Sequence, residues 1–492
     1  MASAAVLALL ALSTPLTETA GRTLLAATWL GLSLLLLAAA AWVLLGLWRQ
    51  AEAAEPRSAS STWKRLTTLA CLAFALYIAS SVSNPLGFAY LARLTLSLGS
   101  NSYFQTAGAT GSLWELLRGY ETKMPAFVSH TQTQGAGPVV LYGLLRRCFA
   151  ALPTTAPAAE ALFALHPGST PDALAERFSK SLRYSISADD VSVALLCSMS
   201  VAFLGALGLI PAYFLGAALG GRPVGTLAAG FYYLTPGMTL YTGFVDQVYP
   251  ALTALILLCW LRALPAQQSN DGRTRWVWAL CAGLLLVVAI FLSLGLLAFW
   301  ALVVLVAVTA AFLVGRSDQR RLGLAQFWQP LALVIAVPLI AFAILRVSAG
   351  YDLLAVCRTS DALRMYGYEV LWGCPYWHYV WANWVEAGMV LGPPLLVALV
   401  WGVYVIARRW REFPHAAGIV IALLVVLAAM DVSGKIRGET SRMWLFLMPV
   451  GAAIAGFVER AGERRPDRAL VGLAVIGALY LLLIRMFFLM WY

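Results

Sequence analysis

Long apolar segments recur along the whole chain and constrain its fold more than any other feature. Because a helix that crosses a bilayer needs roughly 20 mostly apolar residues, about twelve segments qualify as spans. Charged residues make up only 12% of the 492 residues, whereas they form roughly a quarter of an ordinary soluble domain. We therefore predict an all-α polytopic membrane protein with about twelve transmembrane helices, forming a single transmembrane domain over residues 1–492. The expected spans are residues 23–48, 66–83, 190–219, 224–242, 249–265, 276–293, 296–315, 326–348, 385–407, 413–431, 443–459 and 469–489. The uncharged run 276–315 is divided at Ser-Leu-Gly-Leu, residues 293–296, which offers a turn.

Basic residues follow the odd-numbered spans. They are Arg49, Arg57, Lys64, Arg65, Arg222, Arg262, Arg273, Arg275, Arg316, Arg320, Arg321, Arg408, Arg409, Arg411, Arg460, Arg464, Arg465 and Arg468. The positive-inside rule places these connections in the cytoplasm and both termini outside. The formal net charge of +11 is therefore largely a topology signal, and no nucleic-acid partner is expected.

Four of the connections that the predicted topology leaves on the extracytoplasmic face are unusual. Two are long, residues 84–189 and 349–384, and two are short, residues 243–250 and 433–442. Within the first, the apolar residues 137–153 are too few to span comfortably, so we expect an amphipathic helix at the interface.

A polar helix is expected within residues 169–192. Thr170 has the residue type of an N-cap, and Pro171 suits the first helical turn. Ser187 or Asp189 would then cap the following span.

The stretch SGKIRGETSRMWLF carries concentrated charge between two apolar runs. Lys435, Arg437 and Arg442 make it strongly basic, against the positive-inside preference. Carboxylates such as Glu439 and Asp431 could balance them in a structural ion-pair network. Alternatively, these cations bind an anionic ligand, because the Arg fork and the Lys charge both suit phosphate. At a membrane surface, the obvious phosphate belongs to a lipid carrier.

Two other extracytoplasmic segments carry candidate acid or base groups. Asp246 stands in a very short loop, where a charge beside the apolar slab needs a cavity or a partner; it either caps a helix or faces a site. Glu121 and His130 lie close together in the long loop, and both residue types serve as bases. A loop His that simply bonds to backbone is the alternative.

The loop 349–384 is rich in Tyr and Trp, with Arg358 among them. Aromatic faces stack on sugars and also anchor proteins at membrane interfaces. Cys357 and Cys374 could form a disulfide if this loop faces an oxidising compartment. The sequence has no Walker A, GxGxxG, HExxH or GxSxG motif, so nucleotide-driven cytoplasmic chemistry is not expected.

Together these features resemble the GT-C superfamily of multi-span glycosyltransferases, which use sugars linked to polyprenyl phosphate. The long loop 84–189 and Asp246 in GFVDQVYP match the superfamily's layout if the first span is an extra N-terminal one. The segment SHTQTQGAGP resembles the His-rich HPPGP segment of some bacterial members, with Gln134, Gly135 and Ala136 where that pattern has His-Pro-Pro. RGETSRMWLFLMP resembles their late Arg-Glu stretch.

The resemblance implies an enzyme that moves a sugar from a polyprenyl-phosphate donor to a lipid, glycan or protein acceptor on the extracytoplasmic face. It implies catalytic roles among Asp246, Glu121 and His130. It implies substrate binding by Lys435, Arg437, Glu439, Arg442 and Arg358. Some members use a divalent metal bridging the carboxylates; no dedicated ligand cluster is evident in this sequence, so the cofactor stays open.

Two alternatives come from other functional classes. A transporter or flippase of a lipid-linked or anionic substrate would also have about twelve spans. Against it, no two-half repeat is evident, and the charges gather at one face. A non-catalytic scaffold derived from a transferase is the other alternative, since the HPPGP-like segment is altered.

Overall fold

The computed structural model describes residues 18–52, 59–84, 86–166, 169–264, 272–317, 325–371, 373, 375–437, 440–461, 472 and 474–484. Within these ranges the chain is helical and contains no strand. Among the described residues, eight spans are long and apolar enough to cross a membrane, and a ninth is formed if one bent helix pair counts as a single span. This confirms an all-α polytopic membrane protein.

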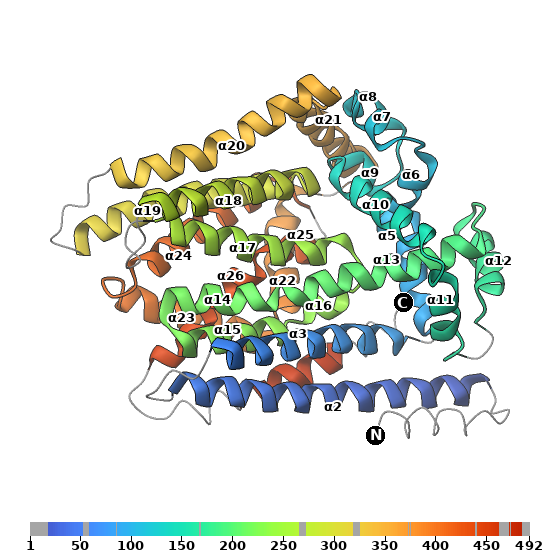
Figure 1. Ribbon diagram of the computed structural model, residues 1–492, viewed down its shortest axis with the longest axis horizontal. Helices are drawn as coiled ribbons and strands as arrows, with labels where there is room; N and C mark the ends of the chain where they lie inside the picture. The colour runs from blue at the N-terminus through green and yellow to red at the C-terminus, as the bar shows by residue number, and fades with distance from the viewer. Residues whose placement is uncertain are drawn as a thin grey trace.

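The eight spans run side by side, as Figure 1 shows for most of them. They comprise α2 (Glu18–Glu52), α3 (Ala59–Val82), α13 (Ala188–Leu207) continued by α14 (Leu209–Gly220), α17 (Val248–Ala263), α18 (Gly272–Leu292), α19 (Leu296–Ser317), α20 (Ala325–Ala349) and α24 (Pro414–Val432). The boundary between α18 and α19 confirms the predicted turn at residues 293–296.

The predicted count of about twelve spans is not confirmed, because prolines and a glycine interrupt the other apolar segments. The predicted span 224–242 is broken at Pro236, and 385–407 bends by 104° at Gly392, whose φ is +80°. The segment 443–459 is divided into an eight-residue α-helix and 3-10 helices on either side of it, and much of 469–489 lies outside the described residues. The resulting elements are α15 (Arg222–Leu234), α16 (Pro236–Leu240), α22 (Tyr376–Leu391), α23 (Pro393–Arg408), η4 (Leu445–Leu447), α26 (Met448–Ala455) and η5 (Gly456–Ala461).

The first long connection folds into short helices gathered at one end of the molecule, which we call the loop end (Figure 1). These are α4 (Phe88–Leu96), α5 (Leu98–Asn101), α6 (Tyr103–Ala109), α7 (Leu113–Leu117), α8 (Tyr120–Lys123), η1 (Met124–Ala126), α9 (His130–Thr133), α10 (Gly137–Ala151), α11 (Thr155–Phe163) and α12 (Pro171–Leu182). From the second long connection, α21 (Leu353–Tyr366) packs against α8 and α9, and is followed by a π-helical turn, η3 (Gly367–Leu371).

Local signals at the loop end match the predictions. The Thr170 side chain accepts a hydrogen bond from the N–H of Ala173 and caps α12. Ser187 forms a capping box with Asp190 at the start of α13. The helix expected within 137–153 is α10, which packs against α6, α13 and α18.

A close backbone contact holds the start of α10. A Cβ added at Gly137 would lie 2.1 Å from the carbonyl oxygen of Phe291, near the end of α18. The altered QGAGP segment therefore uses a glycine to dock on the turn between α18 and α19.

At the opposite end, basic connections meet one another. The guanidinium of Arg460 donates to the carbonyl of Gly220 at 2.7 Å, and Arg409 donates to the carbonyl of Arg460 at 3.1 Å. Three basic connections therefore share one end, as the alternating topology requires. Both chain termini lie outside the described residues, so their orientation stays a prediction.

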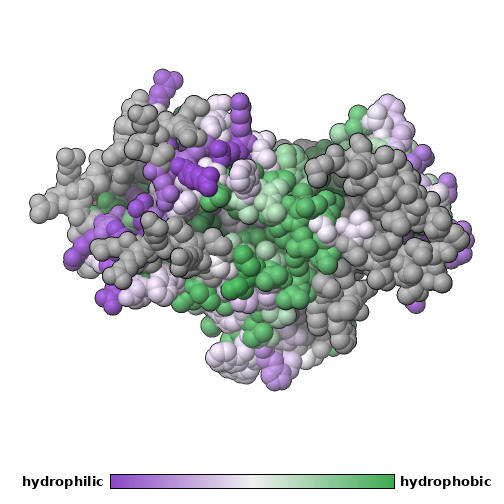
Figure 2. All heavy atoms as spheres, turned by 90° about the horizontal axis from the view of Figure 1, so that it is seen from below, coloured by the Kyte–Doolittle hydropathy of each residue, from purple (hydrophilic) through white to green (hydrophobic). Residues whose placement is uncertain are grey.

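The surface between the two ends is apolar. Figure 2 shows hydrophobic side chains across the middle of one face and hydrophilic ones toward its ends. On α20, Leu339 and Ile344 are 57% and 59% exposed, which suits contact with lipid chains.

Candidate functional site

A buried ion pair joins two segments that are far apart in the sequence. Asp246 lies in the turn η2 (Val245–Gln247), and Arg442 lies in the short helix α25 (Thr440–Met443). The Arg442 Nε donates to Asp246 Oδ2 at 2.6 Å, and the two side chains are 9% and 7% exposed. Such a pair is costly to desolvate, and either charge alone would be more costly still.

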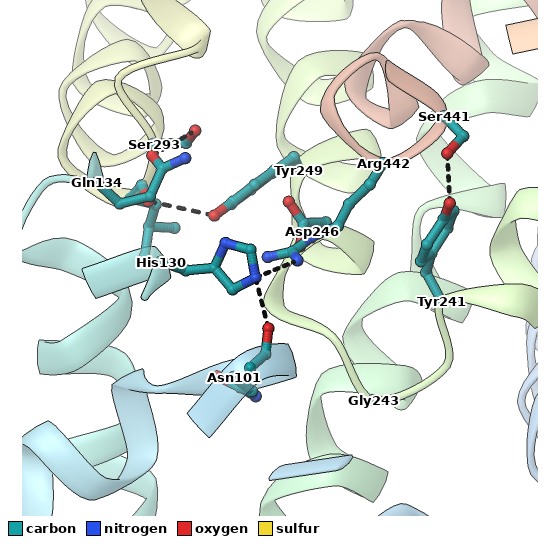
Figure 3. A network of polar contacts seen from close by, with 12 residues as sticks. Asn101, His130, Gln134, Tyr241, Gly243, Asp246, Tyr249, Ser293, Ser441 and Arg442 are labelled. Atoms are coloured by element: carbon teal, nitrogen blue, oxygen red, sulfur yellow. Dashed lines mark hydrogen bonds and ion pairs between the residues drawn. The ribbon is translucent and has the colours of Figure 1, made fainter. Parts of the chain in front are cut away.

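His130 completes a cluster with this pair (Figure 3). Its Nε2 lies 3.2 Å from Arg442 Nη1 and 2.9 Å from the carbonyl oxygen of Gly99 on α5. Burial, reinforced by the Arg442 charge, lowers the pKa of His130 to about 4. The imidazole is therefore neutral at neutral pH, and its Nε2 either donates to Gly99 or accepts from Arg442, according to tautomer.

The loop that carries Asp246 is fixed by Tyr142 of α10. The Tyr142 hydroxyl donates to the carbonyl of Gly243 at 3.2 Å and accepts from Asn101 Nδ2 at 2.6 Å. The Gln247 side chain accepts from the N–H of Gly243 at 2.9 Å. Burial raises the pKa of Tyr142, so the phenol keeps its proton and remains a donor.

The three cations of the basic stretch pair with carboxylates from three different segments. Lys435 Nζ lies 3.0 Å from Asp361 of α21, and Arg437 lies 3.5 Å from Glu369 of η3. Arg437 also faces the rings of Tyr368 and Tyr376, whereas Arg442 pairs with Asp246. Each cation thus pairs with a different carboxylate, and the three do not converge on one anion-binding site.

Asp431, considered as a counter-ion from the sequence, is instead bound by α22. It accepts hydrogen bonds from Asn383 Nδ2 at 3.0 Å and from Trp384 Nε1 at 2.8 Å. Asp361 and Glu369 take the counter-ion role. Their position in the loop facing the basic stretch is the signal that could have identified them.

The other predicted site residues lie apart from the cluster. Glu121 has no hydrogen bond to Asp246, His130 or Arg442, and its buried Oε2 has no partner among the described residues. Arg358 is exposed on α21. Glu439 and Cys374 lie outside the described residues, and Cys357 carries a free thiol.

Arg364, which the sequence does not single out, supports His130 indirectly. Arg364 Nη2 donates to the carbonyl of Thr133 at 3.1 Å, and the Ser360 hydroxyl donates to the same oxygen at 2.6 Å. Since Thr133 ends α9 and His130 begins it, α21 holds the helix that presents the imidazole.

A cavity of about 220 Å³ lies between α19, α21 and the basic stretch. Arg364, Asp361 and Lys435 form its polar wall, and Leu297, Met430 and Met443 form its apolar wall. Met443 follows Arg442 directly in the sequence, so the cavity and the ion pair share the short helix α25, although neither Asp246 nor Arg442 lines the cavity. Its two walls suit a ligand with an anionic group joined to a hydrocarbon chain.

Within the part of the chain that the structure describes, no group of three or more His, Cys, Asp or Glu side chains is placed to hold a metal ion. The divalent metal that the resemblance allows is therefore not assigned to any residues.

Comparison with known proteins gives likeness only to solved structures. No protein-family model matches the chain, and no curated protein sequence matches it. The archaeal oligosaccharyltransferase AglB from Archaeoglobus fulgidus, in complex with an inhibitory peptide and a dolichol-phosphate, is similar at 14% identity with a TM-score of 0.48. That match covers 87% of this chain and 56% of AglB. The A. fulgidus oligosaccharyltransferase in complex with Zn and sulfate is similar at 16% identity with a TM-score of 0.42, covering 81% and 52%. The chain thus spans about half the length of these structures.

Proposed function

We propose that this chain is a membrane glycosyltransferase of the GT-C type, which transfers a sugar from a polyprenyl-phosphate carrier to an acceptor at the loop end. One observation carries the proposal. Asp246, His130 and Arg442, assigned to the site from the sequence, form one cluster around a buried ion pair, and the neighbour of Arg442, Met443, lines a cavity with a polar and an apolar wall.

The cavity is the proposed binding site for the donor's phosphate. Arg364 and Lys435 offer positive charge, while Leu297 and Met430 suit the first isoprene units. Lys435 now pairs with Asp361, but both side chains are about half exposed. Such a surface pair contributes little, so a phosphate can replace the carboxylate as the partner of Lys435.

In the proposed reaction, the acceptor hydroxyl attacks the anomeric carbon of the sugar. The bond from that carbon to the phosphate oxygen breaks, and its electron pair leaves with the lipid phosphate. Asp246 takes the hydroxyl proton, and Arg442 orients the Asp246 carboxylate through their hydrogen bond. Because the imidazole of His130 is neutral, it places no second positive charge beside Arg442.

The first test compares purified wild type with Asp246→Asn, using radiolabelled polyprenyl-phosphate sugars and cell-envelope lipid extracts as acceptors. We expect transfer by wild type and none by Asp246→Asn. Glu369→Gln is the matched control, because Glu369 pairs with Arg437 at the surface. Size-exclusion profiles and thermal melts check that all three proteins are folded. Full transfer by Asp246→Asn would remove Asp246 from the mechanism.

A second test measures donor binding without relying on turnover. Cys357 lines the cavity with a free thiol, so a bound donor should slow its labelling by a maleimide, followed by peptide mass spectrometry. We expect protection by a polyprenyl phosphate and none by inorganic phosphate at the same concentration. Equal labelling with and without the lipid would contradict donor binding in this cavity. Movement of labelled lipid across proteoliposomes without sugar transfer would favour the flippase alternative.

A further inference from the structure

Glu386, a carboxylate on α22, is not part of the ion pair but bonds to the two residues that precede Arg442. Glu386 is half-buried and accepts hydrogen bonds from the N–H of Thr440, at 3.1 Å, and from the hydroxyl of Ser441. Both donors belong to α25, the four-residue helix that presents Arg442. A helix of this length cannot hold its own orientation in isolation, so its place depends on such external bonds.

The same network reaches the loop of Asp246. The Ser441 hydroxyl is also hydrogen-bonded to the hydroxyl of Tyr241, five residues before Asp246 (Figure 3). Tyr241 packs edge-to-face on Phe244, and the guanidinium of Arg442 lies over the Phe244 ring at 5.1 Å. One chain of contacts therefore runs from Glu386 through Ser441, Tyr241 and Phe244 to Arg442, along the loop that precedes Asp246.

The position of Glu386 is itself fixed. One turn earlier on α22, Asn383 donates to Asp431 and to the carbonyl of Ile436, each at 3.0 Å, and accepts from the Thr440 hydroxyl. This face of α22 is thus attached to the end of α24, through Asp431, and to the basic stretch at Ile436 and Thr440. The same helix packs against α25.

We infer that Glu386 is a positioning residue: through Ser441 and Tyr241 it sets the placement of Arg442 relative to Asp246 and His130. Its importance for activity rests on the proposed function, but the geometry can be tested without activity. The carboxylate acts here as an acceptor of two hydrogen bonds, so removing Ser441 should have the same effect as removing Glu386.

The experiment measures how fast diethylpyrocarbonate modifies His130 in the full purified chain, with each histidine resolved by peptide mass spectrometry. We expect Glu386→Ala and Ser441→Ala each to raise the rate at His130 several-fold, because α25 no longer covers the imidazole. The exposed His378 serves as the internal reference, and Glu369→Gln as the control variant. An unchanged His130 rate in both variants would overturn the inference. An increase in Glu386→Ala alone would also overturn it, because Ser441 would then transmit nothing.

Kinetics provide a second readout if wild type transfers sugar. A positioning role predicts that kcat falls by a larger factor than the donor KM rises in both variants, because Met443 is the one lining residue of the cavity that belongs to α25. A raised KM with an unchanged kcat would contradict it. If wild type shows no transfer but His130 becomes reactive in both variants, the proposed function fails while the positioning role stands.

Discussion

At the residue scale, the buried pair of Asp246 and Arg442 depends on both charges being present. Replacing Asp246 by Ala should destabilise the protein by about 3–5 kcal/mol, because Arg442 loses the buried carboxylate to which its Nε donates. The double variant Asp246→Ala/Arg442→Met should be less destabilised than the sum of the single variants, since it leaves no uncompensated charge. Thermal melts of the purified proteins in one detergent measure the difference. Additive losses would mean that the two groups are not coupled.

His130 should make stability depend on pH. Its pKa is lowered from 6.5 to about 4 by burial and by Arg442, so between these values the unfolded chain binds a proton that the folded protein does not. The contribution is complete above pH 6.5 and is lost as the pH falls toward 4, by roughly 3 kcal/mol in total. His130→Gln should flatten this part of the curve of Tm against pH. An identical curve for wild type and variant would refute it.

Which site residues the sequence reveals depends on where their partners lie. Asp246, Arg442 and His130 stand out because charged or titratable groups beside apolar runs need a reason to be there. Glu386 and Arg364 do not stand out, because their roles rest on hydrogen bonds to α25 and α9 that exist only in the folded protein. The pairing of Lys435 with Asp361 is likewise a product of the fold.

At the element scale, caps and prolines decide where helices begin and end, and these signals are local. The Thr170 cap, the Ser187 capping box and the turn at residues 293–296 were therefore predictable. Hydropathy alone does not distinguish a continuous span from one broken by proline, so residues 443–459 read as one span although Pro449 lies within them. The contacts that settle such cases are made between segments.

The docking of α10 on the turn between α18 and α19 gives a prediction at this scale. Gly137→Ala should destabilise the protein by about 1–3 kcal/mol, because the new Cβ meets the backbone of Phe291, which cannot rotate away. Gly111→Ala is the control, since a Cβ there meets nothing within 4 Å. Thermal melts compare the two variants with wild type. Equal melting temperatures for the two would show that the α18–α19 turn yields easily.

At the scale of the whole molecule, the two ends differ in charge, and the difference predicts orientation. Basic connections gather at the end formed by α14–α15, α23–α24 and η5, which the positive-inside rule assigns to the cytoplasm. The candidate site lies at the loop end, so the same rule makes it extracytoplasmic. That placement matters because the proposed donor would then bind the protein from the extracytoplasmic side of the membrane.

Single reporter cysteines test this orientation in intact cells. We expect a membrane-impermeant maleimide to label Lys180→Cys on α12 and to leave Arg411→Cys unlabelled, although both positions are exposed in the protein. Labelling of both after permeabilisation is the control that each thiol can react, and the parent chain measures the background from its native cysteines. The reverse result in intact cells would put the Asp246 cluster on the cytoplasmic side. The donor would then have to present its sugar from that side, and every extracytoplasmic assignment made from the charges would be wrong.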